Sequence, residues 1–220
     1  MAIRVLLFEP EDILYKRPQP NQHFHAFLEK LGLQPRHPQM VQRALKAGYF
    51  DVIHGRITRD DFYDAILRFY EIEGETVIPI GRKALLADSM SIEAMNDAPS
   101  VLKNLQADGF KLALVMNSEH PSQDVITMLA RAGFPTALWS SVTTSCQVGK
   151  SIPDKSIFDT ALDKAEASPG ETAFISPRGE ILVRVMEYGL ATVAFGQPEN
   201  NAFADHCFQH LSELYQFLTK

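Results

Sequence analysis

The stretch that decides the fold is Val5-Leu-Leu-Phe8, followed at once by Glu9-Pro10-Glu11-Asp12-Ile13-Leu14. Its first four residues are all apolar, which is typical of a strand buried on both faces of a parallel sheet. Pro10 cannot donate to a ladder of strand hydrogen bonds, so we expect the strand to end just before it. Glu9 and Glu11 would then lie at the carboxyl end of a strand, where ligands bind on open α/β sheets.

Helical periodicity replaces this pattern between His23 and about Ala87. Apolar residues repeat at intervals of three and four before Gly32, and Thr58-Arg-Asp-Asp61 predicts a capped start for an amphipathic helix over 62–70. No strand is predicted between His23 and Ala87. We therefore expect residues 16–95 to form an inserted, all-helical domain, and residues 1–15 and 96–220 to form the domain that carries it.

Strands and helices alternate after this insertion. Apolar runs predict strands over 111–116, 137–141, 172–175 and 191–195, and periodicity predicts helices over 100–108, 123–132, 156–165, 179–188 and 211–218. Repeated strand-helix units of this length imply right-handed crossovers. The sequence thus predicts an α/β fold with a doubly wound parallel sheet.

Composition limits the partners. The formal net charge is -6 and the basic residues are scattered, which argues against nucleic acid as a partner because phosphate neutralisation needs clustered Lys and Arg. The apolar runs are too short for a membrane span, and the start shows no secretory signal, so we expect a cytoplasmic protein. Cys146 and Cys207 are isolated in the sequence, which predicts buried, reduced thiols rather than zinc ligands or a disulfide framework.

Four stretches, in this order and at these spacings, resemble the motifs of the haloacid dehalogenase superfamily. They are the stretch 5–14 quoted above, Leu112-Ala-Leu-Val-Met116-Asn117-Ser118, Ile152-Pro-Asp-Lys-Ser-Ile-Phe158, and Phe174-Ile-Ser176-Pro177 with Gly189 about a dozen residues on. The resemblance covers nearly the whole chain and matches the subgroup with a helical cap. It implies a Rossmann-like core with an inserted cap and, in active members, a hydrolase that uses Mg²⁺.

The resemblance also assigns roles to the first motif, from which this sequence departs. In the family, one aspartate attacks the substrate to form a covalent intermediate, and a second protonates the leaving group. Glu9 and Glu11 align with these aspartates. The extra methylene moves each carboxylate by about an ångström, a misplacement that can cost about a hundredfold in rate. Asp12 and Ile13 replace the Gly-Thr at which the family's backbone turns sharply.

The other three motifs differ at their centres. The positions of the family's hydroxyl, its lysine and its two metal-binding acids are occupied by Met116, Ile152, Ser176 and Pro177. Ser118 is the nearest substitute for the hydroxyl and Lys150 for the lysine, while Glu9, Glu11 and Glu180 are the remaining acids that could meet a metal. We therefore predict no cofactor, with Mg²⁺ required only if the chain is active.

Three hypotheses follow. The leading one is a pseudoenzyme that has lost phosphatase or dehalogenase activity and binds a protein partner, a ligand or a second copy of itself. The first alternative is an active, phosphatase-like hydrolase in which Glu9 and Glu11 act with a substitute cation from Lys150. The second is a sensor or carrier that takes a neutral or cationic ligand into the vacant cleft. The ligand-binding candidates are Glu9, Glu11, Asn117, Ser118, His120, Lys150 and Ser176.

Overall fold

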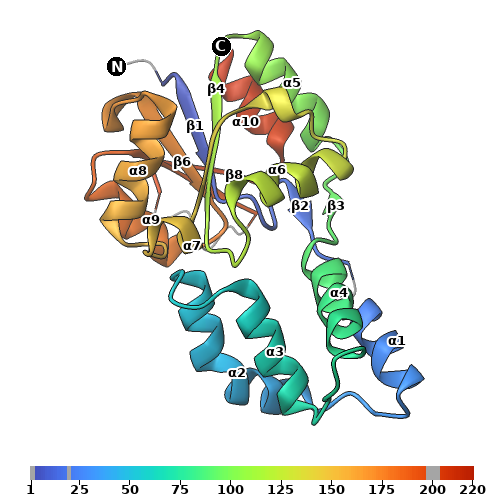
Figure 1. The fold of residues 1–220 in the computed structure, drawn as a ribbon. Coiled ribbons are helices and arrows are strands. Elements are labelled where there is room, and N and C mark those ends of the chain that lie inside the picture. Colours follow the sequence, from blue (N-terminus) through green and yellow to red (C-terminus); the bar gives the residue numbers. More distant parts are fainter. Residues whose placement is uncertain (1–2, 19–20, 197–203) are drawn as a thin grey trace.

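The computed structural model describes residues 3–18, 21–196 and 204–220, and its centre is a six-stranded sheet (Figure 1). The strands are β1 (Val5–Phe8), β4 (Lys111–Met116), β5 (Trp139–Thr144), β6 (Thr172–Ser176), β7 (Ala191–Phe195) and β8 (His206–Phe208). Their order is β5-β4-β1-β6-β7-β8, and all neighbours are parallel. The chain builds outward from β1 to one edge and then returns to β6 to build the other. This is the predicted doubly wound sheet, and its switch point lies beside β1.

Alternate residues of β1 belong to two separate cores. Leu6 and Phe8 pack with α5, α6 and α10, whereas Val5 and Leu7 pack with α8 and α9. Helices therefore cover both faces of the sheet (Figure 1), which explains why the strand is apolar throughout. The helical segments of this domain are α5 (Ala98–Ala107), α6 (Ser122–Arg131), α7 (Ser145–Val148), α8 (Lys155–Ala165), α9 (Gly179–Met186), α10 (Leu211–Leu218) and the short 3-10 turns η1 (Thr136–Leu138) and η2 (Pro169–Glu171).

The insertion lies below one end of the sheet (Figure 1) and has a core of its own. Its helices are α1 (Gln22–Lys30), α2 (Pro38–Ile53), α3 (Arg59–Phe69) and α4 (Ile78–Ser89). The predicted cap of α3 is confirmed, since Asp61 N–H donates to Thr58 Oγ1 over 3.1 Å and the Asp61 side chain accepts from Thr58 N–H over 3.1 Å. We call this helical layer the cap.

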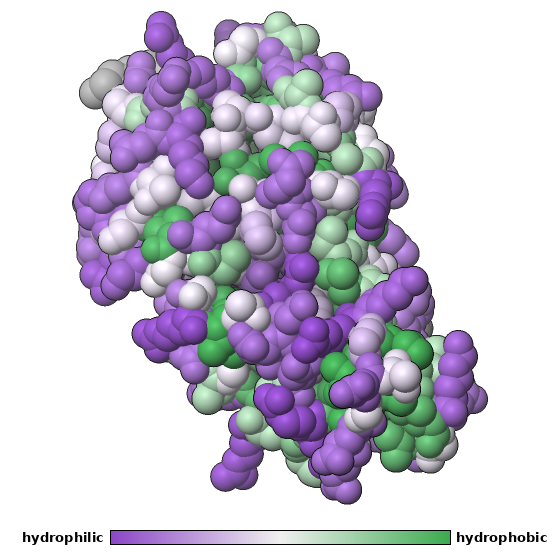
Figure 2. Space-filling model, viewed as in Figure 1, coloured by the Kyte–Doolittle hydropathy of each residue, from purple (hydrophilic) through white to green (hydrophobic). Residues whose placement is uncertain are grey.

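The cap exposes much of its apolar surface. Helix α2 buries only Val52 and Ile53, while Met40, Tyr49 and Phe50 are each nearly half exposed. Figure 2 shows an apolar patch at the lower right of the molecule, in the region of α1 and α4, and smaller apolar areas higher on the same face. None of the helices in the described ranges is long and apolar enough to cross a membrane.

Several local features differ from the sequence-based expectation. An antiparallel pair, β2 (Tyr15–Lys16) and β3 (Glu93–Ala94), connects the cap to the sheet domain, so residues 16–95 are not helical throughout. Two-residue strands carry no readable period, which is why they were not predicted. The strand expected over 137–141 is instead the turn η1 followed by β5, and β8 was not predicted. Cys146 and Cys207 are half-buried rather than buried.

Candidate functional site

The turn after β1 brings the first motif to the carboxyl end of the sheet. Asp12 adopts a left-handed backbone conformation, with φ of 63°, and its N–H donates to the Tyr15 carbonyl over 2.9 Å. Aspartate tolerates this conformation better than most residues, at a cost of about 1 kcal/mol. The chain therefore keeps a sharp turn at the position where the family has glycine.

Both oxygens of the Glu9 carboxylate are engaged by neighbouring side chains. Glu9 is 8% exposed, and its Oε2 accepts from Ser176 Oγ over 2.6 Å and from Arg178 Nε over 3.2 Å. Arg178 Nη2 donates to Oε1, so the guanidinium grips the carboxylate with two donors. Burial lowers the pKa of the Arg178 guanidinium below its ordinary value. Glu9 is thus neutralised at the position where the family has its nucleophile.

Arg178 is one of two site residues that the sequence reasoning missed. It follows Pro177, one position beyond the metal acids of the fourth motif, and its own N–H donates to Ser176 Oγ over 3.0 Å. Ser176 is fully buried between Glu9 and Arg178. A cation next to two lost acids was a visible signal, because an arginine attracts the Glu9 carboxylate, whereas acids at the same place would repel it.

The residues at the centres of the second and third motifs pack in the core or form hydrogen bonds within the sheet domain. Met116 is 5% exposed and packs in the core beneath α5, α6 and α10. Asn117 Oδ1 accepts the Ile152 N–H over 2.8 Å, which ties the end of β4 to the third motif. Ile152 itself is 6% exposed and packs in the opposite core. An apolar side chain therefore fills the position of the family's lysine.

The proposed substitutes for the hydroxyl and the lysine are also engaged elsewhere. Ser118 Oγ accepts the His120 N–H over 2.9 Å, and Ser145 Oγ accepts the Ser118 N–H over 3.0 Å, so Ser118 shapes its own loop. Lys150 is exposed and pairs with Asp154 over 3.6 Å. Within the described ranges, no ion pair joins Lys150 to Glu9 or Glu11.

These residues do not fit the Mg²⁺ that the family uses. The two oxygens of Glu9 already accept from Ser176 and Arg178, and Glu180 is exposed at the start of α9. Pro177 has no ligand atom in its side chain. The described residues contain no group of three or more His, Cys, Asp or Glu arranged to hold a metal ion. Mg²⁺ normally needs carboxylate ligands that are free to bind it.

A cleft of about 360 Å³ lies between this end of the sheet and the cap. Glu11 lines it and pairs with Arg17 over 3.3 Å. Asn117 and Glu119 line the cleft from the loop after β4, and Tyr49 and Tyr63 line it from the cap. Of the seven ligand-binding candidates from the sequence, the structure places Glu11 and Asn117 in the wall of this cleft.

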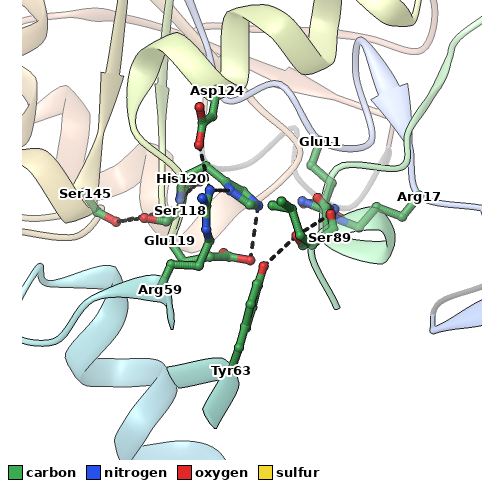
Figure 3. A network of polar contacts seen from close by, with 11 residues as sticks. Glu11, Arg17, Arg59, Tyr63, Ser89, Ser118, Glu119, His120, Asp124 and Ser145 are labelled. Atoms are coloured by element: carbon green, nitrogen blue, oxygen red, sulfur yellow. Dashed lines mark hydrogen bonds and ion pairs between the residues drawn. The ribbon is translucent and has the colours of Figure 1, made fainter. Parts of the chain in front are cut away.

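A polar network beside the cleft joins the cap to the sheet domain (Figure 3). Arg59, at the start of α3, donates from Nη1 to Asp124 Oδ2 over 2.6 Å and to His120 Nδ1 over 2.9 Å. His120 is 1% exposed, and burial lowers its pKa, so its ring is neutral at pH 7. Because Nδ1 accepts, the ring proton is on Nε2, which lies 3.4 Å from Glu119 Oε1. Glu119 was not among the residues singled out in the sequence.

Solved structures with the same fold cover nearly the whole chain. A 2-haloacid dehalogenase from Pseudomonas syringae pv. Tomato DC3000 has a TM-score of 0.76 at 14% identity, covering 99% of both chains. The defluorinating L-2-haloacid dehalogenase Rha0230 has a TM-score of 0.75 at 16% identity, covering 99% of this chain and 96% of the other. A Bacillus subtilis HAD hydrolase, YfnB, solved bound to magnesium, has a TM-score of 0.68 at 20% identity over 100% of both chains.

The family of the chain is shown by a comparison of its sequence with family models. No curated protein matches the chain. The model of the haloacid dehalogenase-like hydrolases matches residues 17–176, well over half of the chain. The four motif frames, the doubly wound sheet with its cap and this match agree, and the chain belongs to the haloacid dehalogenase-like hydrolase family.

Proposed function

We propose that this chain keeps the scaffold of its family without the family's hydrolysis, and that it acts by binding. One observation carries the proposal: the Glu9 carboxylate, at the nucleophile's position, is held by Ser176 and Arg178. A nucleophilic carboxylate needs a free oxygen that can approach the substrate to about 3–3.5 Å. The ion pair with Arg178 would have to open before Glu9 could react.

The surrounding electrostatics support the same proposal. Preorganised charge usually supplies the largest single contribution to catalysis. Here Ile152 stands where the family has a lysine, and the cation of Lys150 is paired with Asp154. The cation at the Glu9 carboxylate is Arg178, which holds both of its oxygens, and the described residues around it offer no set of acids for a metal.

Binding is proposed at two places. The exposed apolar side chains of α2, which include Met40 and Phe50, suit a protein partner or a second copy of this chain. The cleft between cap and sheet suits a small molecule. We also propose that the protein acts in the cytoplasm.

A turnover assay tests the loss of hydrolysis. Purified protein is incubated with Mg²⁺ and a panel of phosphate esters and 2-haloacids, and product is measured for the natural chain, for Glu9→Ala and for Glu75→Ala. We expect all three to give the same background rate. Glu75 is an exposed acid of the cap, outside the four motifs, and is a matched control for removal of a carboxylate. Turnover that Glu9→Ala abolishes and Glu75→Ala leaves intact would refute the proposal.

A further inference from the structure

The carboxylate of Glu119 lacks a basic partner. Its side chain is 15% exposed, and within the described ranges its ion-pair contact is with His120, whose ring is neutral. No Lys or Arg of the described ranges lies within 4 Å of it, since neither Arg17 nor Arg59 pairs with it. A partly buried carboxylate without a counter-ion is costly unless something else compensates its charge.

The other charged groups of the cleft are already paired. Arg17 is held by Glu11 and by the Ser89 carbonyl, to which its Nη1 donates over 2.7 Å. Asp88 accepts the N–H groups of His23 and Phe24 at the start of α1, over 2.9 and 2.8 Å. Glu119 therefore leaves one uncompensated negative charge in the wall of the cleft.

Two buried polar atoms near Glu119 also lack a hydrogen-bond partner among the described residues. Tyr15 is fully buried and its hydroxyl has no partner. Burial raises the pKa of Tyr15, and the charges of Glu11 and Glu119 in the cleft wall raise it further, against the effect of Arg17. His120 Nε2 has no hydrogen bond and points toward the Glu119 carboxylate (Figure 3). Unsatisfied buried polar atoms are uncommon in folded proteins and call for an explanation at each site.

The cap supplies an aromatic wall opposite this carboxylate. Tyr49, Phe62 and Tyr63 line the cleft, and successive ring centroids are 6.1 and 6.3 Å apart. The Tyr63 hydroxyl lies 2.7 Å from Ser89 Oγ in the wall of the same cleft as Glu119, and burial, followed by the Glu119 carboxylate, raises the pKa of Tyr63. The face of an aromatic ring attracts a cation.

We propose that the cleft binds a small organic cation, with the Glu119 carboxylate as its counter-ion and the rings of Tyr49, Phe62 and Tyr63 as its wall. This inference rests on the proposed function, since it assigns a ligand class to the cleft of a protein that does not hydrolyse. An ammonium group would neutralise the Glu119 carboxylate, with which neither Arg17 nor Arg59 pairs. The aromatic rings would cover the apolar substituents of the ligand. The cleft volume of about 360 Å³ lies at the small end of the usual range for ligand sites.

Choline and its neutral isostere 3,3-dimethylbutan-1-ol are the probes. We titrate the full chain with each by isothermal calorimetry, and expect choline to bind about tenfold more tightly or better, because only choline carries the charge that Glu119 attracts. Glu119→Gln should weaken choline binding about tenfold and leave the isostere unaffected. Tyr49→Leu should weaken it about threefold, while Tyr49→Phe, which keeps the ring, leaves it unchanged.

Two controls distinguish a variant that has lost the binding site from a variant that has failed to fold. Glu180→Gln removes an exposed carboxylate outside the cleft lining and should bind choline as the natural chain does. Thermal unfolding of Glu119→Gln establishes that the variant is folded at the titration temperature. Absence of choline binding up to about 10 mM, equal binding of the isostere, or unchanged choline affinity in Glu119→Gln would overturn the proposal. Displacement of choline by Mg²⁺ would assign Glu119 to a metal instead and would also overturn it.

The two proposals fail separately. Turnover that depends on Glu9 would refute the loss of hydrolysis and leave the choline titration unaffected. Failure of choline to bind would refute the cation site and leave the turnover result unaffected.

Discussion

Two carboxylates at the same end of the sheet, Glu9 after β1 and Glu119 after β4, stand in opposite surroundings. Glu9 is enclosed by Ser176 and Arg178, and both its oxygens accept hydrogen bonds. Glu119 faces a neutral imidazole and a cleft. At the position that carries the family's chemistry, Glu9 forms an ion pair with Arg178, while the neighbouring loop presents to the cap a carboxylate without a basic partner. We propose that binding uses this second carboxylate.

The largest expected effect comes from separating the cap from the Glu119 side of the sheet domain. Gly55 has φ of 65°, and a Cβ at this position would lie 2.2 Å from the Cys146 carbonyl oxygen. Gly55→Ala should lower the free energy of unfolding by about 3 kcal/mol, because backbone on both sides of the contact must move. Urea denaturation measures this. Gly32→Ala is the matched control: φ is 71° with no atom within 4 Å, so it should cost only about 1 kcal/mol. If both variants lost the same free energy of unfolding, the close contact between Gly55 of the cap and the Cys146 carbonyl of the sheet domain would be contradicted.

A smaller effect is expected from the polar contact that joins the same two parts. Arg59→Ala removes the donors to Asp124 and His120, and should cost about 1–2 kcal/mol, since the pair is partly exposed. Hydrogen exchange of α2 and α3 should become faster. Arg82→Ala removes an arginine that pairs with Asp64 inside the cap, so it should leave the contact between cap and core intact. Unchanged thermal stability and unchanged exchange in α2 and α3 after Arg59→Ala would argue against Arg59 as the connection.

The loop after β4, which carries both Asn117 and Glu119, offers a third test. Asn117→Ala leaves the Ile152 N–H without its acceptor and should cost about 1 kcal/mol. Thermal unfolding reports the loss. Asn117→Asp keeps an acceptor oxygen at this position and should recover most of the stability, and a variant that is no better than alanine would contradict the role given to this hydrogen bond.

The smallest expected effect is a dependence of stability on pH through His120. Burial lowers the His120 pKa in the folded state below its ordinary value of 6.5, so between these two values the unfolded chain binds the proton more readily. Stability should therefore fall as the pH falls from about 6.5 toward the folded-state pKa, and this contribution should be level above 6.5. The natural chain is compared with His120→Gln by denaturation at several pH values. An identical slope in both would exclude His120 as its source.

The sheet domain was largely predictable from sequence because its signals are local. The strands β4 and β7 and the helix α10 coincide with their predicted ranges. Apolar runs and helical periods can be recognised from the segment's own sequence, without knowing which elements pack against it. The capped start of α3 at Thr58 was equally local. The order of the four motifs then gave the fold.

The site was less predictable because its contacts join distant positions. Glu9 and Arg178 are 169 residues apart, so no period or spacing relates them. The loss of the family's acids at Ser176 and Pro177 was visible, but the ion pair that replaces them depends on the parallel pairing of β1 and β6. Glu119 is an ordinary loop acid in sequence, and its lack of a cation is a property of the folded cleft.

A double-mutant cycle between Glu9 and Arg178 tests the central claim most directly. The free energy of unfolding is measured for the natural chain, Glu9→Gln, Arg178→Leu and the double variant. If Glu9 is held as a structural ion pair, the two residues should be coupled by about 2 kcal/mol, below the range for fully buried pairs because the Arg178 side chain is 40% exposed. A coupling within about 0.3 kcal/mol of zero would show that Glu9 and Arg178 act independently, and would contradict the account.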